Sequence, residues 1–342
     1  MDTISLIHEW RALFEIAADM LDLDHTIDDM KLKHLRALQV IAESGSIQEA
    51  SRRLCLTQPA VSRIVREFES EIGLPLLIRT TRGATLTEYA DLIVRRAGAI
   101  HREIERIGEY VDEIRGMLNG RLSIAVSAPT MSTALIDTLA DFANERPHVD
   151  LQIRELRTLQ IEDSLRDGAI DVGVLTHFGD QSVFPYQAEL LYQGDMVLAI
   201  SSRYAGPASL SLSALQKMPW LTLDLVQDDN SFISVLMKSA GLPLPERIIR
   251  SAATTMYRGI ARRVGAVSIW TATGSDFLQR CFAEGEMRRI IVADPMPRMS
   301  VRLAYPDRDL MTTPARDFAL WLRNKVERDG FRYDARDIEF QT

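Results

Sequence analysis

A regular row of apolar residues between positions 93 and 118 constrains the fold of this chain more than any other feature of its sequence. The row alternates steps of four and three residues and consists of Ile93, Ala97, Ile100, Ile104, Ile107, Val111, Ile114 and Leu118. Such a heptad seam is typical of a long helix that packs against a partner helix, because a lone helix would leave the seam exposed to water. We therefore expect a dimerisation helix and a homodimer or homotetramer. The alternative is a helix that packs on the core of its own domain, which would tolerate a wider and less regular stripe.

Three short helical patterns and a hairpin pattern precede the seam. The first helix should end at Gly45, and Ser46 opens the second with a Ser-x-x-Glu capping box. Thr57 caps the third helix, which has Pro59 in its first turn. Residues 76–86 then alternate around Gly83 as a short hairpin does. Two helices joined by a tight turn and followed by a hairpin predict a winged helix-turn-helix in residues 31–88, with a linker helix in residues 89–119.

Charge is unevenly distributed along the chain. The net charge is −8, yet residues 31–96 hold eleven Lys and Arg against seven acidic residues. This basic block hints at a polyanionic partner. Residues 1–30 hold eight acidic residues and only one basic residue. In this acidic N-terminal extension, the apolar stripe from Leu6 to Leu21 could form a helix that docks near the basic block and repels phosphate.

Short strand and helix patterns alternate through residues 120–342 and predict an open, mostly parallel α/β architecture. Its length favours two lobes with a cleft, which we place at 120–191 plus 287–342 and at 192–286. Ligands of such sheets bind beyond the carboxyl ends of strands and at helix N-termini. The candidate effector-binding residues are therefore Ser127, Thr130, Met131, Thr176, His177, Ser202 and Thr271. The alternatives are simple helix capping by the Ser and Thr residues and a structural or cleft-edge position for His177.

The sequence contains no motif for catalysis, phosphate binding or a metal site, so we expect neither an enzyme nor a cofactor. Cys55 and Cys281 belong to different predicted domains, and we expect both to be packed apolar residues. No run approaches the roughly 18 apolar residues of a membrane span. No signal peptide is visible either, so we expect a cytoplasmic protein without a membrane partner.

Four stretches of residues 30–88 resemble the DNA-binding domain of LysR-type transcriptional regulators. They are Met30-Lys-Leu-Lys-His-Leu-Arg-Ala-Leu, Ser46-Ile-Gln-Glu-Ala-Ser-Arg-Arg-Leu, Thr57-Gln-Pro-Ala-Val-Ser-Arg and Arg79-Thr-Thr-Arg-Gly-Ala-Thr-Leu-Thr-Glu. The remaining layout is similar to the family's linker helix and its two-lobed effector domain, which resembles periplasmic binding proteins. Two departures are Trp270, where a Pro normally ends the family's strand, and Leu77-Ile78, where an aromatic and an acidic residue are usual. The resemblance also implies a second interpretation of the acidic N-terminal extension, a true start at Met30, because members of the family usually begin near this position.

The resemblance implies a dimer or tetramer that binds interrupted palindromes in double-stranded DNA. A small inducer in the cleft, expected to be an organic, aromatic or sugar acid, would change the DNA bend and the contact with RNA polymerase. A rival function is a DNA-binding regulator whose C-terminal domain only oligomerises and binds no inducer. A second rival is an enzyme that the front domain targets to DNA.

The third helix of the front domain would then enter the major groove. The residues expected near DNA are Thr57, Gln58, Pro59, Ser62, Arg63 and Arg66. Arg suits guanine and Gln suits adenine, although some of these side chains could contact phosphates alone. Arg79, Thr81 and Arg82 on the hairpin suit the DNA backbone or the minor groove. The alternative for these three is an ordinary solvated hairpin.

Overall fold

A computed structural model of the chain describes residues 31–80, 83–115, 120–178, 186–224, 228–272 and 275–329. The expectations for residues 1–30, Thr81, Arg82 and Leu118 lie outside the described residues. The chain divides into two compact units, with the boundary between Glu105 and Arg106. Within the described ranges, no helix is both long and apolar enough to cross a membrane.

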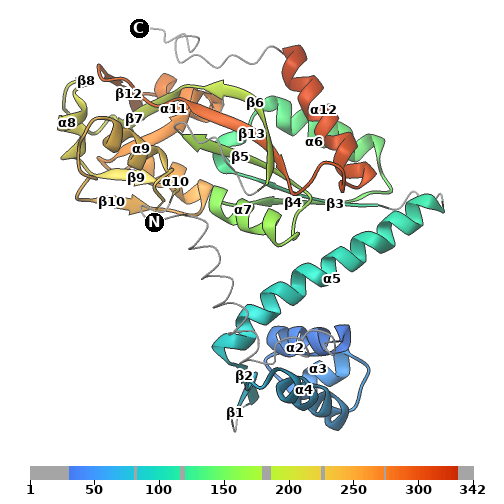
Figure 1. Cartoon of the computed structure of the whole chain (residues 1–342). Helices are drawn as coiled ribbons and strands as arrows, with labels where there is room; N and C mark the ends of the chain where they lie inside the picture. Colours follow the sequence, from blue (N-terminus) through green and yellow to red (C-terminus); the bar gives the residue numbers. More distant parts are fainter. Residues whose placement is uncertain are drawn as a thin grey trace, which may run out of the picture. The chain divides into compact units, whose positions relative to one another are not determined.

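The first unit has the predicted winged helix-turn-helix architecture. It contains α2 (Leu32–Ser44), α3 (Ile47–Arg53), α4 (Gln58–Ile72), the antiparallel hairpin of β1 (Leu77–Thr80) and β2 (Gly83–Leu86), and the start of α5 (Glu88–Ile114) (Figure 1). The helix ends follow the sequence signals. α2 ends at Gly45, whose φ of 66° suits glycine. The Ser46 and Thr57 side chains accept hydrogen bonds from the backbone N–H groups of Glu49 and Ala60.

The core of the first unit fixes α4 from one side only. Val61, Val65 and Phe68 of α4 are buried against the other helices. Glu69 extends this attachment to the hairpin, because its Oε1 accepts hydrogen bonds from the N–H groups of Leu76 (2.9 Å) and Leu77 (3.2 Å). The opposite face of α4 is exposed in the part of the chain that the structure describes.

One cysteine differs from expectation. Cys281 is buried as predicted, but Cys55 is exposed. Cys55 has a φ of 54°, a left-handed conformation that the tight turn between α3 and α4 requires and that is usually left to glycine. The prediction of a packed Cys55 is therefore wrong, because the backbone turn and not the side chain determines its place.

The second unit has two lobes, each built on one sheet. The first lobe has the strand order β4-β3-β5-β13-β6. Its elements are β3 (Arg121–Val126), the short 3₁₀ helix η1 (Ala128–Thr130), α6 (Thr133–Glu145), β4 (Asp150–Glu155), α7 (Thr158–Arg166), β5 (Val172–Phe178), β6 (Gln187–Gly194), β13 (Met299–Tyr305) and α12 (Thr313–Asp329). Alternate residues of β5 face opposite sides, so Val174 packs in the cluster of α6 and α12, and Leu175 packs against α7.

The second lobe has the strand order β10-β9-β11-β7-β12-β8. Its elements are β7 (Met196–Ser201), β8 (Ser209–Leu210), α8 (Leu212–Gln216), β9 (Trp220–Thr222), α9 (Phe232–Ser239), β10 (Ile248–Arg250), α10 (Thr254–Ala261), β11 (Val267–Thr271), α11 (Ser275–Ala283) and β12 (Met287–Val292). α9 packs on one face of this sheet, and α10 and α11 pack on the other.

Strand pairing supports one expectation for these lobes and corrects another. The sheets are mostly parallel, as expected, with one antiparallel strand in each, β13 in the first lobe and β7 in the second. The expected lobe boundaries at residues 191 and 287 are wrong, since β6 pairs with β13 through Gly194 and β12 pairs with β7 and β8. The chain crosses between the lobes at Asp195 and again after Val292. Arg298 connects these crossings, with its Nε 3.0 Å from Oδ1 of Asp195.

Candidate functional site

The exposed face of α4 carries the residues that the sequence predicts near DNA. Gln58, Ser62 and Arg66 follow one another at four-residue intervals, and Pro59 and Arg63 lie beside them. All of them except the half-buried Ser62 are exposed. The structure thus brings these polar side chains together on a single helical surface.

The two arginines of this face have different local surroundings. The Nε of Arg66 donates a hydrogen bond to the backbone oxygen of Ser62 on the same helix (3.1 Å). The exposed Arg63 guanidinium has no hydrogen-bond or ion-pair partner in the described part of the chain. Its donors therefore remain available for a bidentate acceptor such as guanine. Thr57 is committed to capping, because its Oγ1 accepts from the N–H of Ala60 at 3.3 Å.

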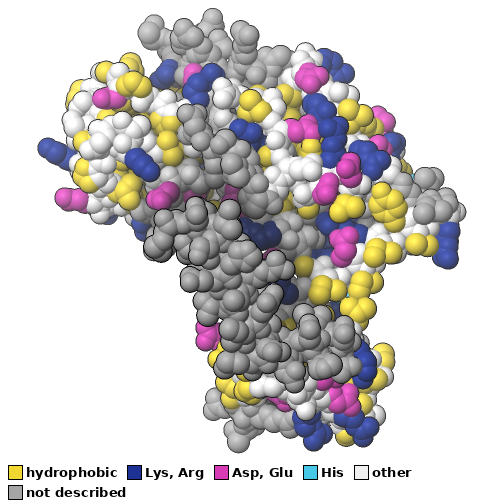
Figure 2. Space-filling view, in the orientation of Figure 1, with side chains coloured by type: hydrophobic (Ala, Val, Ile, Leu, Met, Phe, Trp, Pro, Cys, Tyr) yellow, Lys and Arg dark blue, Asp and Glu magenta, His cyan; other side chains and the backbone are white. Residues whose placement is uncertain are grey.

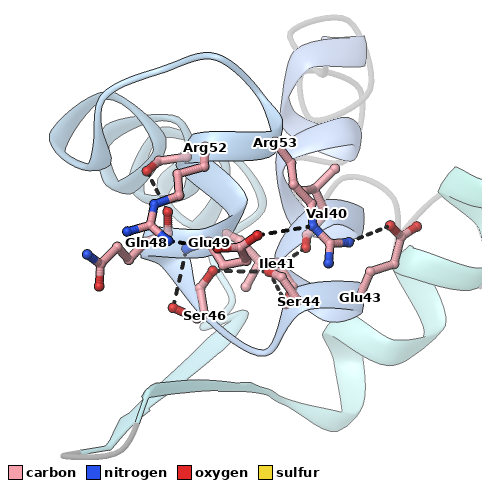
Figure 3. A network of polar contacts seen from close by, with 10 residues as sticks. Val40, Ile41, Glu43, Ser44, Ser46, Gln48, Glu49, Arg52 and Arg53 are labelled. Atoms are coloured by element: carbon pink, nitrogen blue, oxygen red, sulfur yellow. Dashed lines mark hydrogen bonds and ion pairs between the residues drawn. The ribbon is translucent and has the colours of Figure 1, made fainter.

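A polar network holds the helices behind this surface (Figure 3). Arg52 and Arg53 of α3 are engaged by carboxylates, with Arg52 Nη1 3.3 Å from Glu49 and Arg53 reaching both Glu49 (3.7 Å) and Glu43 (3.9 Å). Ser44 Oγ donates to the backbone oxygen of Val40 at 2.7 Å. Arg53 therefore connects α3 to α2, Arg52 pairs only within α3, and both differ from Arg63 in being engaged inside the unit.

The heptad seam of α5 is divided into two parts. Ile93 and Ala97 pack in the core of the first unit with Leu35 and Phe68, so the prediction that a partner helix covers Ala97 is wrong. The next four seam positions, Ile100, Ile104, Ile107 and Val111, are 40–59% exposed. Figure 2 shows hydrophobic side chains in yellow along α5. This second part is an apolar surface of the kind that a partner helix covers.

A cleft in the second unit lies at the carboxyl ends of parallel strands from both lobes. It consists of two adjoining cavities that share Ala128, Pro129, Glu155, Leu223, Asp224 and Thr254. One cavity is mainly apolar and is lined by Met131, Phe178, Met196, Phe232, Tyr257, Ile269 and Trp270, among others. The Trp270 ring lies between two other rings, with centroids 5.2 Å from Tyr257 and 5.4 Å from Phe277. Trp270 thus forms an aromatic wall where the family pattern has Pro.

The other cavity is polar and has a volume of about 460 Å³. Glu155 and Arg157 line it from the first lobe, and Asp224 lines it from the second. The hydroxyl of Thr254 donates a hydrogen bond to Glu155, which connects the two lobes across the cleft. The start of α10 also lines this cavity, and Ala253 at its N-cap position supplies no side-chain acceptor for the first N–H groups of the helix.

Two polar groups of this cavity are candidates for ligand contact. Burial raises the pKa of Asp224 to about 6, the nearby charge of Asp228 raises it further, and Arg157 lowers it without coming within ion-pair distance. The Ser127 hydroxyl is 2% exposed and has no hydrogen-bond partner in the parts that the structure describes. Buried polar groups usually have partners, so the Ser127 hydroxyl could bind a ligand. Asp224 is half-buried and makes no ion pair within the described residues, so its carboxylate could bind a ligand as well.

Four of the predicted effector residues line the cleft. Met131 and Thr271 lie in the apolar cavity, and Ser127 and Thr176 lie in the polar cavity. Thr130 is buried and lines neither cavity, because its Oγ1 donates to the backbone oxygen of Ser127 (2.7 Å).

His177 and Ser202 lie away from these four residues. His177 points to the other side of β5, where its Nε2 is 3.1 Å from the Tyr186 hydroxyl, which donates to Glu162 (2.8 Å). The prediction that Ser202 lies in the effector site is wrong. Ser202 follows β7, which runs antiparallel to β11, so the carboxyl end of β7 lies at the opposite edge of the sheet from Thr271.

Sequence reasoning missed the charged residues of the cleft. Glu155 ends β4 and Arg157 follows it, so the rule that ligands bind beyond the carboxyl ends of strands would have selected this region, as it did after β3 and β5. Asp224 follows β9, which has only three residues and gives no strand signal of its own. No cluster of three or more His, Cys, Asp or Glu side chains able to hold a metal lies in the portion of the chain that the structure describes.

A winged helix-turn-helix joined through a long helix to a two-lobed α/β domain with a cleft defines a class of DNA-binding transcriptional regulators. Comparison with known proteins identifies the class more narrowly. Residues 32–91 match the bacterial regulatory helix-turn-helix protein of the lysR family, and residues 115–327 match the LysR substrate binding domain. The chain therefore belongs to the LysR family, whose members are transcriptional regulators and not enzymes.

Individual relatives are distant. The HTH-type transcriptional regulator TdcA of Escherichia coli (strain K12) is 26% identical over 233 residues, which cover 66% of this chain and 73% of that protein. The structure of ArgP from Mycobacterium tuberculosis is similar with a TM-score of 0.61 at 20% identity, covering 88% of this chain and 98% of that chain. Full-length CbnR complexed with its target DNA has a TM-score of 0.58 at 21% identity, covering 87% and 99%. These structures share the fold of this chain.

Proposed function

We propose that residues 31–88 recognise a specific operator in double-stranded DNA and that residues 120–342 bind a small-molecule inducer that controls this recognition. Residues 89–119 form the linker and dimerisation helix between them. The observation that carries the DNA-binding part is the exposed face of α4, on which the Arg63 guanidinium has no protein partner in the described residues.

In this proposal the side chains of α4 divide into two roles. One group reads base edges or contacts phosphates in the major groove and consists of Gln58, Ser62, Arg63 and Arg66. The other group, Thr57 and Pro59 at the start of the helix, approaches the sugar-phosphate backbone of the DNA. Arg79, Thr81 and Arg82 of the wing contact the backbone or the minor groove.

Selection of binding duplexes from a random library, followed by footprinting of the full-length protein, tests base reading. Arg63→Ala should weaken the selected site far more than random DNA, because a bidentate base contact discriminates between sequences. Arg36→Ala is the matched control, because Arg36 is an exposed arginine of α2 that is hydrogen-bonded to Gln39. Equal losses on selected and random duplexes would reduce Arg63 to a phosphate contact.

The exposed part of the α5 seam supports dimerisation. Ile100, Ile104, Ile107 and Val111 form a continuous apolar row on one helix, to which the predicted seam adds Ile114 and Leu118. A symmetric pair of such helices would present two copies of α4 to the DNA, and a two-fold protein suits an interrupted palindrome. Whether the assembly is a dimer or a tetramer is measured by light scattering of the full-length protein.

The lining of the cleft supports the proposal that residues 120–342 bind an inducer. The free N–H groups of α10, the Arg157 guanidinium and the Ser127 hydroxyl suit a carboxylate, in line with the expected organic, aromatic or sugar acid. An inducer that binds one arrangement of the lobes better than another would change DNA contacts and the contact with RNA polymerase. A metabolite panel in the footprinting assay tests this part. A footprint insensitive to every compound would favour the rival in which residues 120–342 only oligomerise.

A further inference from the structure

We infer that the ligand of the cleft is a small zwitterion with an apolar group, an apolar α-amino acid being the simplest chemistry that fits. The inference rests on the proposed inducer site and specifies which chemical class that site takes. It depends on three features that converge on the same cleft, namely acidic groups that make no ion pair in the described residues, donors for an anion and an apolar cavity.

The first feature is a pair of acidic groups without an ion pair in the described residues, although Arg157 lines the same cavity and Arg258 lines the adjoining one. Asp224 and Glu155 both line the polar cavity, and Asp224 makes no ion pair within the described residues. Burial weakens the hydration of its carboxylate, which is reflected in its raised pKa. A simple organic acid would bring a further negative charge to these groups. A ligand ammonium group would instead neutralise the Asp224 carboxylate and donate hydrogen bonds to it.

The second feature is a set of donors beside those acidic groups. Ala252, Ala253 and Thr254 place the uncapped start of α10 on the same cavity, and Arg157 adds a positive charge. The Ser127 hydroxyl, almost completely buried and without a partner in the described residues, is an independent indication of a ligand contact in this cavity. A ligand carboxylate satisfies these donors.

The residues that line the polar cavity determine how far apart the charged groups of the ligand can be. The donors and the two acidic residues belong to one cavity, so the ligand's positive and negative groups must lie close together, as on a single α-carbon. Glu155, Asp224 and Thr254 also border the adjoining apolar cavity. An apolar group attached at the same carbon would enter that cavity, between Met131, Phe232 and Trp270.

Matched ligands test the inference with the full-length protein. Calorimetric titration would compare L-leucine with 4-methylpentanoate, which lacks the ammonium group, and with 3-methylbutylamine, which lacks the carboxylate. A second set consists of L-phenylalanine, 3-phenylpropanoate and 2-phenylethylamine. In the set that binds, the amino acid should bind at least about tenfold more tightly than either partial ligand, because each loses a charged hydrogen-bonded contact.

Two variants separate specific recognition from general charge. Asp224→Asn should abolish the preference for the amino acid over the matched acid. Asp163→Asn should retain it, because this exposed carboxylate is paired with Arg166 (3.0 Å) and does not line the cleft. An acid that binds as tightly as its amino acid, a preference that survives in Asp224→Asn, or no binding by any of the six compounds would overturn the inference. If another class of metabolite then alters the footprint, the proposed inducer function stands without this inference, whereas a footprint that no metabolite alters removes both.

Discussion

Replacing Asp224 by Asn is expected to stabilise the ligand-free protein. The pKa of this carboxyl is raised from 3.8 to about 6, mainly by burial and secondly by the charge of Asp228, while Arg157 acts in the opposite direction. The folded state therefore disfavours the ionised form. Asn has nearly the same shape and no charge, so the variant reports the free energy that the ionised carboxylate costs the fold.

The magnitude follows from proton linkage. A pKa difference of one unit corresponds to about 1.4 kcal/mol, so the ionised carboxylate lowers the free energy of unfolding by up to about 3 kcal/mol at pH 7.5. Water still reaches the partly buried side chain, which reduces the expected value to about 2 kcal/mol. An acid whose pKa is higher in the folded state destabilises the protein as the pH rises from about 4 to about 6. At pH 5 the advantage of the variant should therefore be about half of its value at pH 7.5.

Denaturant unfolding of the full-length protein at pH 5 and pH 7.5 measures this difference. Tryptophan fluorescence reports on the second unit, which contains Trp220, Trp270 and Trp321. Asp163→Asn is the control and should change the free energy of unfolding by less than about 0.5 kcal/mol. An Asp224→Asn protein no more stable than the unaltered chain at pH 7.5, or one with the same advantage at both pH values, would refute the reasoning.

Three other substitutions have expected outcomes in different parts of the molecule. Arg63→Ala should lower specific DNA binding by about 1–3 kcal/mol in footprinting, and an unchanged affinity would contradict base reading. Ile104→Glu combined with Ile107→Glu should convert the oligomer to monomers in light scattering, while Glu105→Gln on the same helix should not. An oligomer that survives the double substitution would contradict dimerisation through the seam of α5. Glu69→Ala should destabilise the first unit by about 1–3 kcal/mol in thermal unfolding, because the N–H groups of Leu76 and Leu77 lose their acceptor. Glu69→Gln keeps an acceptor oxygen, so equal losses in both variants would contradict that explanation.

The first unit could be predicted closely from sequence because its signals are local. Gly45, Ser46 and Thr57 each determine a helix end through their own backbone or side-chain chemistry. The seam of α5 was less predictable. Its spacing shows that a face is apolar, but it does not show which part is covered by the chain itself, as Ala97 is, and which part is left for a partner.

The cleft could be predicted only where one strand and the residues after it suffice. Ser127, Thr176 and Thr271 were found because Ser127 follows a recognisable strand and the other two lie in the carboxyl-terminal part of one, at the edge that borders the cleft. Ser202 was assigned wrongly because strand direction is set by pairing with segments distant in sequence. Asp224 was missed because β9 is held in its sheet by β10 and β11 and not by a pattern of its own.

The group that weakens the free protein is also the one that gains most from a positively charged ligand. An ammonium group beside Asp224 would lower its pKa and remove the destabilisation that the ionised carboxylate causes in the empty cleft. Because Glu155 and Asp224 come from different lobes, a ligand that engages both favours one arrangement of the lobes, and only such a difference in affinity can shift a conformational equilibrium. Binding should therefore release protons near pH 6, and calorimetry in buffers of different ionisation enthalpy should detect that release in the unaltered protein but not in Asp224→Asn. Equal proton release by both proteins would show that the released protons do not come from the Asp224 carboxyl and would contradict this explanation.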